Sequence, residues 1–149
     1  NKYDVYLYVY LGRIYQLKED PKKEKEADEK ALKELMPVQP YLQQLVLAFT
    51  EQKKYDQALA AYNKARKHTP DYPFFYERAE VYRAKNDLVS MINEYLDALE
   101  YQETELFAVQ NHLQNSLGYD DEEGGIRNPL LKQELQKRIQ KNPQKVVLT

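Results

Sequence analysis

The sequence contains no cysteine and no tryptophan, and glycine occurs only 4 times in 149 residues. Without cysteine, disulfide bonds, thiolate catalysis and cysteine-based zinc sites are excluded. No apolar run approaches the roughly 20 residues that a helix needs to span a bilayer, so we expect no membrane span. The net charge of −2 lacks the basic excess that is typical of nucleic-acid-binding proteins, and we expect no nucleic-acid partner.

Residues that carry catalysis are also scarce. His68 and His112 stand far apart in the sequence, without the spacing of a metal site, and the chain has no glycine-rich phosphate loop. Four adjacent acidic residues, 120–123, lack the alternating ligand spacing of a calcium loop. We therefore predict that the protein is not an enzyme and that it holds no cofactor or metal ion.

The chain does have a succession of helical patterns separated by short breaks. Apolar residues recur at three- and four-residue steps, proline or glycine marks most breaks, and no alternating β-pattern of useful length occurs. We therefore expect an all-α chain, in which short connections make neighbouring helices antiparallel. The expected helices span residues 3–18, 22–35, 41–52, 55–68, 73–85 and 88–101, with a helical stripe over 106–117 and a last helix from 129 to 142.

A repeat of 33 residues runs through the middle of the chain. The first set of repeated positions is Leu42, Ala48, Phe49, Tyr55, Tyr62 and Ala65, and it recurs as Phe75, Val81, Tyr82, Leu88, Tyr95 and Ala98. A fixed period of this length is typical of stacked helical hairpins. Arrays of this kind present a long curved surface rather than a catalytic pocket.

The first predicted helix resembles the signature of the tetratricopeptide repeat. The family's pattern, aromatic-x2-L-G-x2-Y, is matched by Tyr8, Leu11, Gly12 and Tyr15. The corresponding residues of the next two units are Leu42, Leu45, Val46 and Phe49, and then Phe75, Arg78, Ala79 and Tyr82. The family's second helix carries a small residue, an aromatic, a small residue and a proline, here Ala58, Tyr62, Ala65 and Pro70. The resemblance implies an α-solenoid of antiparallel hairpins that forms a right-handed superhelix.

The resemblance also implies one array over residues 1–149. Its predicted parts are repeats at about 5–38, 39–71 and 72–103, a degenerate fourth hairpin at 104–142 with a long loop at 118–128, and the start of a truncated further helix at 143–149. Two registers stay open in the first repeat. Either Ala31 is the later small residue, which puts Asp28 where the family has an aromatic, or an insertion at residues 22–26 shifts the register.

We also expect the sequence to be a segment of a longer repeat protein. It begins at Asn1 rather than at methionine, and residues 5–11 make the first helix apolar on all sides. Terminal repeats normally have a polar outer face, so an apolar first helix indicates a further neighbour.

In the tetratricopeptide family the first helix of each unit lines a concave surface that binds partner proteins. The lining residues carried over by position are Val9, Arg13 and Gln16, then Gln43, Leu47 and Thr50, then Tyr76, Glu80 and Arg83, with Tyr6 beside them. The resemblance thus implies a scaffold that binds a peptide or helix of a partner protein in this groove. Two alternatives remain: Glu80 and Arg83 pair with each other, and the chain is a structural segment that self-associates as a homodimer through exposed apolar ends.

Overall fold

The structure, a computed structural model, describes residues 1–118 and 128–144. Within these residues every regular element is helical, which confirms the all-α prediction. The helices are α1 (Tyr6–Leu17), α2 (Pro21–Glu34), α3 (Tyr41–Glu51), α4 (Tyr55–His68), α5 (Phe75–Ala84), α6 (Leu88–Tyr101), the short η1 (Glu103–Glu105), α7 (Leu106–Leu117) and α8 (Pro129–Lys141). Their bounds follow the predicted helices closely. The acidic loop and most of the predicted further helix lie outside the described residues.

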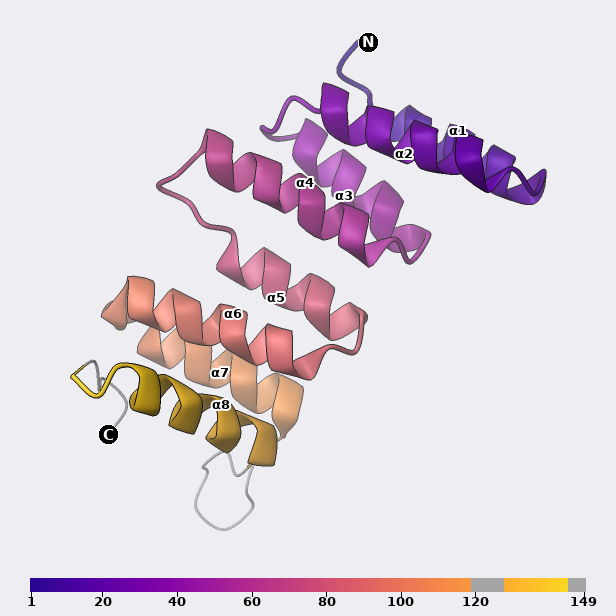
Figure 1. The fold of residues 1–149 in the computed structure, drawn as a ribbon. Helices are drawn as coiled ribbons and strands as arrows, with labels where there is room; N and C mark the ends of the chain where they lie inside the picture. Colours follow the sequence, from indigo (N-terminus) through magenta and orange to yellow (C-terminus); the bar gives the residue numbers. More distant parts are fainter. Residues whose placement is uncertain (119–127, 145–149) are drawn as a thin grey trace. The chain divides into compact units, whose positions relative to one another are not determined.

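Contacts divide the chain into two units, residues 1–74 and 75–149. Unit 1 holds α1 to α4 and unit 2 holds α5 to α8, as Figure 1 shows in sequence colours. The single array over residues 1–149 stays a prediction.

Unit 1 consists of two helical hairpins that pack on each other. Helix α1 pairs with α2 and α3 pairs with α4, while α1 also contacts α3 and α2 contacts α4. The side chains in this core that are 0–1% exposed include Val5, Val9, Leu42, Leu45 and Phe49. Gly12 allows α1 to approach α2 closely, because a Cβ at this position would lie 3.1 Å from Oδ1 of Asp28 and 3.6 Å from Cβ of Ala27.

Unit 2 is built around α6. This helix contacts α5, α7 and α8, and its buried residues supply most of the unit's core. The completely or almost completely buried side chains are Ala79, Met91, Ile92, Tyr95, Leu96, Ala98, Leu99 and Val109. Arg78 of α5 is also buried, and its Nε donates to Oε1 of Glu94 on α6 at 2.9 Å.

The turns inside three hairpins share one backbone geometry. Each has a residue with positive φ, Glu19 (55°), Lys53 (57°) or Asn86 (63°). In each turn the N–H of the next residue donates to a carbonyl five positions earlier, at 2.8–2.9 Å, and these carbonyls belong to Tyr15, Phe49 and Tyr82. This pattern is the Schellman motif, which satisfies the carbonyls at the end of a helix. The sequence repeat is therefore accompanied by a repeated turn.

The register of the first repeat is also informed by the structure. Ala31 is completely buried, as are its counterparts Ala65 and Ala98 to within 2%. Asp28 is only 4% exposed, and its Oδ2 accepts a hydrogen bond of 2.7 Å from Nζ of Lys54 at the start of α4. This placement favours the register in which an aspartate stands at the aromatic position and a lysine from the next hairpin covers it.

Candidate binding surface

In unit 1 most of the predicted lining residues are accessible. Arg13, Gln16, Gln43 and Leu47 are exposed, and Leu47 is 56% exposed although it is apolar. Tyr6 and Thr50 are partly exposed. These residues come from α1 and α3, the first helices of the two hairpins.

Val9 is an exception and corrects the predicted lining. Its side chain is completely buried, and its carbonyl accepts a hydrogen bond of 3.3 Å from Nε2 of Gln52, next to the end of α3. Because α1 packs on α3, this position belongs to the core and is not available to a partner.

The structure adds Tyr10 and Glu51 to the surface of unit 1. The hydroxyl of Tyr10 donates to Oε2 of Glu51 at 3.4 Å, so these side chains join α1 to α3 on the outside. Burial raises the pKa of Tyr10, and the Glu51 carboxylate raises it further. The rings of Tyr6 and Tyr10 meet edge to face at 6.0 Å. The four-residue step between these tyrosines was the sequence signal for a shared helix face.

The unit 1 surface is defined here as Tyr6, Tyr10, Arg13, Leu47 and Glu51. Nη1 of Arg13 also donates to Oε1 of Gln16. A guanidinium has five N–H donors, so this contact leaves capacity for a carboxylate or carbonyl of a partner.

In unit 2 the predicted residues Glu80 and Arg83 pair with each other. Nε and Nη2 of Arg83 lie 3.1 and 2.6 Å from Oε2 of Glu80, one helical turn away. The hydrogen bond with Glu80 raises the pKa of Arg83. Both side chains are about half exposed, so solvent screens the pair and it adds little to stability. The alternative that these residues bind each other is therefore confirmed.

Tyr76, the third predicted residue of unit 2, belongs to an aromatic cluster. Its ring lies 4.9 Å from that of His112 and 5.9 Å from that of Tyr95, and the latter two rings stack at 5.3 Å. The Tyr76 hydroxyl donates to Oε2 of Glu105 at 2.6 Å, and the Tyr95 hydroxyl donates to Oε1 of Glu80 at 3.2 Å. Burial raises the pKa of Tyr95, and the nearby Glu80 raises it further.

The unit 2 surface is defined here as Tyr76, Glu80, Arg83, Glu105 and His112. Sequence reasoning missed Glu105 and His112, which belong to η1 and α7. They contact Tyr76 of α5 only because tertiary packing brings these elements together. Together these groups place aromatic rings beside carboxylates.

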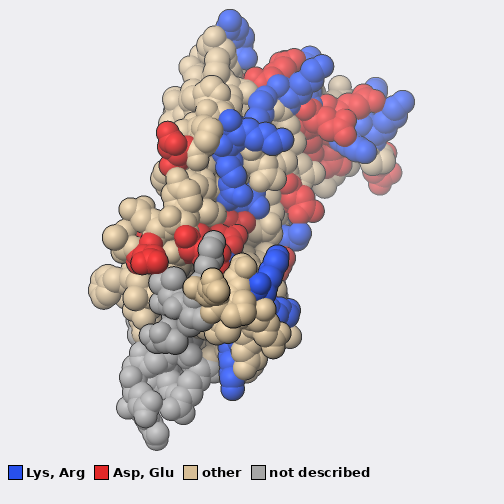
Figure 2. Space-filling view, turned by 60° about the vertical axis from the view of Figure 1, so that its left-hand side comes forward, with Lys and Arg blue, Asp and Glu red and all other residues tan. Residues whose placement is uncertain are grey.

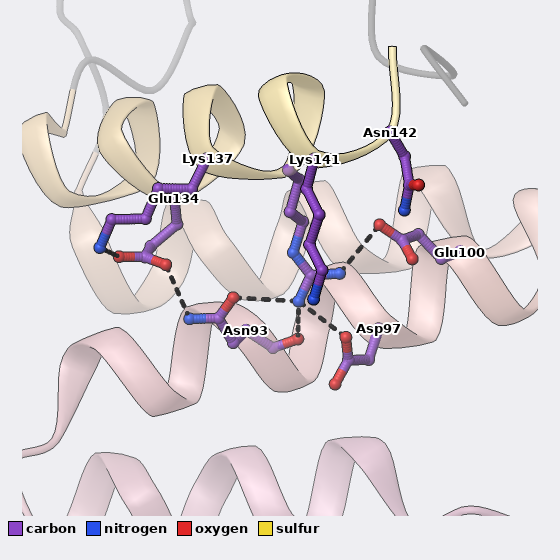
Figure 3. Close-up of a pocket in the computed structure, with 8 residues that line it drawn as sticks. Asn93, Asp97, Glu100, Glu134, Lys137, Lys141 and Asn142 are labelled. Carbon is purple, nitrogen blue, oxygen red and sulfur yellow. Dashed lines mark hydrogen bonds and ion pairs between the residues drawn. The ribbon is translucent and has the colours of Figure 1, made fainter. Parts of the chain in front are cut away.

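A cavity of about 320 Å³ lies between α6 and α8 (Figure 3). Its centre is Arg138, whose Nη2 donates to Oδ1 of Asp97 at 2.7 Å and to both oxygens of Asn93 at 3.0 Å, while Nη1 donates to Glu100 at 3.0 Å. Hydrogen bonds from Asn93 and Lys137 lower the pKa of Glu134. Because the charged groups of this cavity mostly bind one another, we interpret them as contacts that hold α8 on α6.

Other kinds of site find no support in the described part of the chain. There, no three or more His, Asp or Glu side chains come together so as to hold a metal ion. Among the helices described, none is long and apolar enough to cross a membrane. Positive and negative side chains lie next to one another on the face drawn in Figure 2, which is unlike the single-sign surface of a nucleic-acid-binding protein.

Comparison with known proteins gives no match: no family model, no curated protein and no solved structure is similar to this chain.

Proposed function

We propose that this chain is a protein-binding scaffold of tetratricopeptide-like hairpins, which holds a peptide or helix of a partner protein on the first helices of its hairpins. The repeated Schellman turns at Glu19, Lys53 and Asn86 support a common hairpin, since they recur with the period of the sequence repeat. In unit 1 the contacts of α1 with α3 and of α2 with α4 are those expected of stacked hairpins.

The observation that carries the binding proposal is the unit 1 surface. Leu47 and Tyr10 are 56% and 44% exposed, and polar groups of Arg13 and Glu51 accompany them on α1 and α3. Large exposed apolar and aromatic side chains with polar neighbours are typical of protein interfaces, in which tyrosine and arginine often dominate the binding energy. The unit 2 surface has the same character, with Tyr76 and His112 beside carboxylates.

A displayed library of random peptides, selected on the full chain, tests this proposal. The selected peptides are then titrated against Leu47→Asp, which disrupts the unit 1 surface, and against Tyr76→Ala with Arg83→Ala, which disrupts the unit 2 surface. We expect at least a roughly tenfold loss of affinity from one of these variants, because hot-spot truncation costs about 2 kcal/mol or more.

Ile139→Asp is the matched control. Ile139 is 43% exposed on α8 and belongs to neither surface, so this variant should bind as the parent chain does. Circular dichroism should give the same helix content for all variants. Equal affinity for the parent and for both surface variants would contradict the proposal.

A further inference from the structure

One side of α1 is apolar and open to solvent. Leu7, Leu11 and Ile14 follow one another at steps of four and three residues, and they are 54%, 38% and 49% exposed. These spacings place them on one side of the helix, away from the buried side that carries Val9 and Gly12. We call Leu7, Leu11 and Ile14 the outer stripe.

Two of the three corresponding positions of α3 are covered, and the third, Tyr41, which corresponds to Leu7, is partly exposed. Leu45 and Ala48 stand 34 positions after Leu11 and Ile14, and they are 0% and 1% exposed. They lie in the core of unit 1, where α3 packs against α1. The same side of the repeated helix is therefore largely buried under another helix in α3 and is unpartnered in α1. A helix is thus the kind of element that fits the outer stripe.

The charges at the two ends of α1 indicate which helix fits the outer stripe. Asp4 precedes the helix, where its Oδ2 lies 3.4 Å from the N-terminal ammonium of Asn1, and Lys18 follows the last residue of the helix, with the outer stripe between them. If a second α1 lies antiparallel on the first, Asp4 of one copy approaches Lys18 of the other, and the pair forms twice. The N-terminus of each helix then also lies near the C-terminus of its neighbour, which favours opposite ends of the helix dipoles. A parallel arrangement would place like charges together.

From this complementarity we propose that the outer stripe is a self-association surface for a second copy of this chain. The two α1 helices pack antiparallel about a two-fold axis near Leu11, so that each copy uses the same patch. The contact is essentially one pair of short helices, which is smaller than a standard stable interface, so the dimer is weak. The outer stripe shares no residue with the unit 1 surface, although Tyr10 borders it, three residues after Leu7 and four before Ile14. The proposal therefore does not rest on the peptide-binding proposal.

Light scattering on the full chain at roughly 5 µM and roughly 500 µM brackets the dissociation constants expected of such a weak dimer. We expect the mass to rise toward that of a dimer at the higher concentration. Leu11→Glu should abolish this rise, since it places two carboxylates at the two-fold axis. Ile139→Glu, at an apolar side chain of α8 that is 43% exposed, should leave it unchanged.

A charge exchange tests the antiparallel arrangement without touching the apolar contact. Asp4→Lys alone should weaken the dimer at least roughly fivefold, because it faces Lys18 of the other copy. Asp4→Lys combined with Lys18→Asp should restore the parent's affinity. A monomer at both concentrations, or a dimer that survives Leu11→Glu, would overturn the proposal. A double variant as weak as Asp4→Lys would overturn the antiparallel packing.

Discussion

The α1–α2 hairpin of unit 1 and the α5–α6 hairpin of unit 2 have the same turn, but they differ in the residues that pack between their two helices. In unit 1, Gly12 lets α1 lie against Ala27 and Asp28. In unit 2, α5 buries Arg78, which is 7% exposed and bonds to Glu94 on α6 at 2.9 Å. The contact of α1 with α2 depends on the absence of a side chain at Gly12, which leaves room for Asp28. A buried ion pair depends on both partners, since either charge left alone in the core is strongly unfavourable. The same turn therefore connects helices whose buried contacts differ.

Polar groups also join the parts of the units differently. In unit 1, Lys54, the residue before α4, lies 2.7 Å from Asp28 and 3.0 Å from Glu24, so it links the two hairpins. In unit 2, Arg138 links α8 to α6 through Asp97 and its neighbours. In unit 1 this network lies where the first register of the repeat has an aromatic residue in place of Asp28.

The largest expected effect comes from Arg78→Leu. This change removes the guanidinium that pairs with the Glu94 carboxylate in the core, and we expect unit 2 to lose about 3–5 kcal/mol of unfolding free energy. Native-state hydrogen exchange of the α6 amides measures this in the full chain and separates unit 2 from unit 1.

The double variant Arg78→Leu with Glu94→Leu should recover most of that loss, because it removes both charges from the core. Arg83→Leu is the matched control, since its pair with Glu80 is about half exposed and contributes less than about 1 kcal/mol. If Arg78→Leu and Arg83→Leu destabilise unit 2 equally, the packing of α5 on α6 does not depend on the Arg78–Glu94 ion pair.

The covered and open sides of the repeated helix give the next prediction. Leu45→Ala should destabilise unit 1 by about 2–5 kcal/mol, because it opens a cavity in a core position that is 0% exposed. Leu11→Ala, at the corresponding position of α1, should lose less than about 1 kcal/mol, because its side chain is 38% exposed. Urea unfolding at low protein concentration, where the proposed dimer dissociates, compares the two. Equal losses would mean that the outer stripe is already covered.

The contact between Asp28 and Lys54 in unit 1 is sensitive to pH. Burial raises the pKa of Asp28, against the lowering effect of the Lys54 ammonium. Because the folded pKa lies above the unfolded one, the contribution of Asp28 is most favourable below its unfolded pKa and is lost as pH rises through the folded value.

Lys54→Met should strengthen this dependence. Without the ammonium the Asp28 carboxylate has less support, so the variant should lose about 1–3 kcal/mol at pH 7 and less than that near pH 4. Unfolding free energies of parent and variant over this pH range are the measurement. Lys25→Met, at a side chain that is 78% exposed, should show no such difference. A loss that does not change with pH would mean that Asp28 is not the group responsible.

The helices could be predicted from sequence because their signals are local. Asp20 before Pro21 marks the start of α2, for example, and its side chain accepts a hydrogen bond from the N–H of Lys23. The candidate surfaces were predicted only in part. Val9 follows the family's lining pattern but is buried, because the packing of α1 on α3 decides its exposure.

Partners that are distant in sequence could not be predicted. Arg78 stands where the first repeat has a leucine, and nothing near it in the sequence identifies Glu94, 16 positions later, as the group that neutralises it. The same holds for His112 and Glu105, which reach Tyr76 only after α7 packs on α6. Such contacts depend on tertiary structure, which a helical period does not encode.

The smallest expected effect lies in the shared turns, and it again separates the units. Lys53 and Asn86 have φ values of 57° and 63° at the same place in the Schellman motif. A lysine pays a steric penalty in this left-handed region that glycine avoids, whereas asparagine tolerates it better. Lys53→Gly should therefore stabilise unit 1 by up to about 1 kcal/mol, and Asn86→Gly should stabilise unit 2 by less than about 0.5 kcal/mol. Hydrogen exchange of α3 and α6 amides in the two variants measures both values. Destabilisation by Lys53→Gly would mean that the lysine side chain contributes a contact outweighing the strain of its backbone.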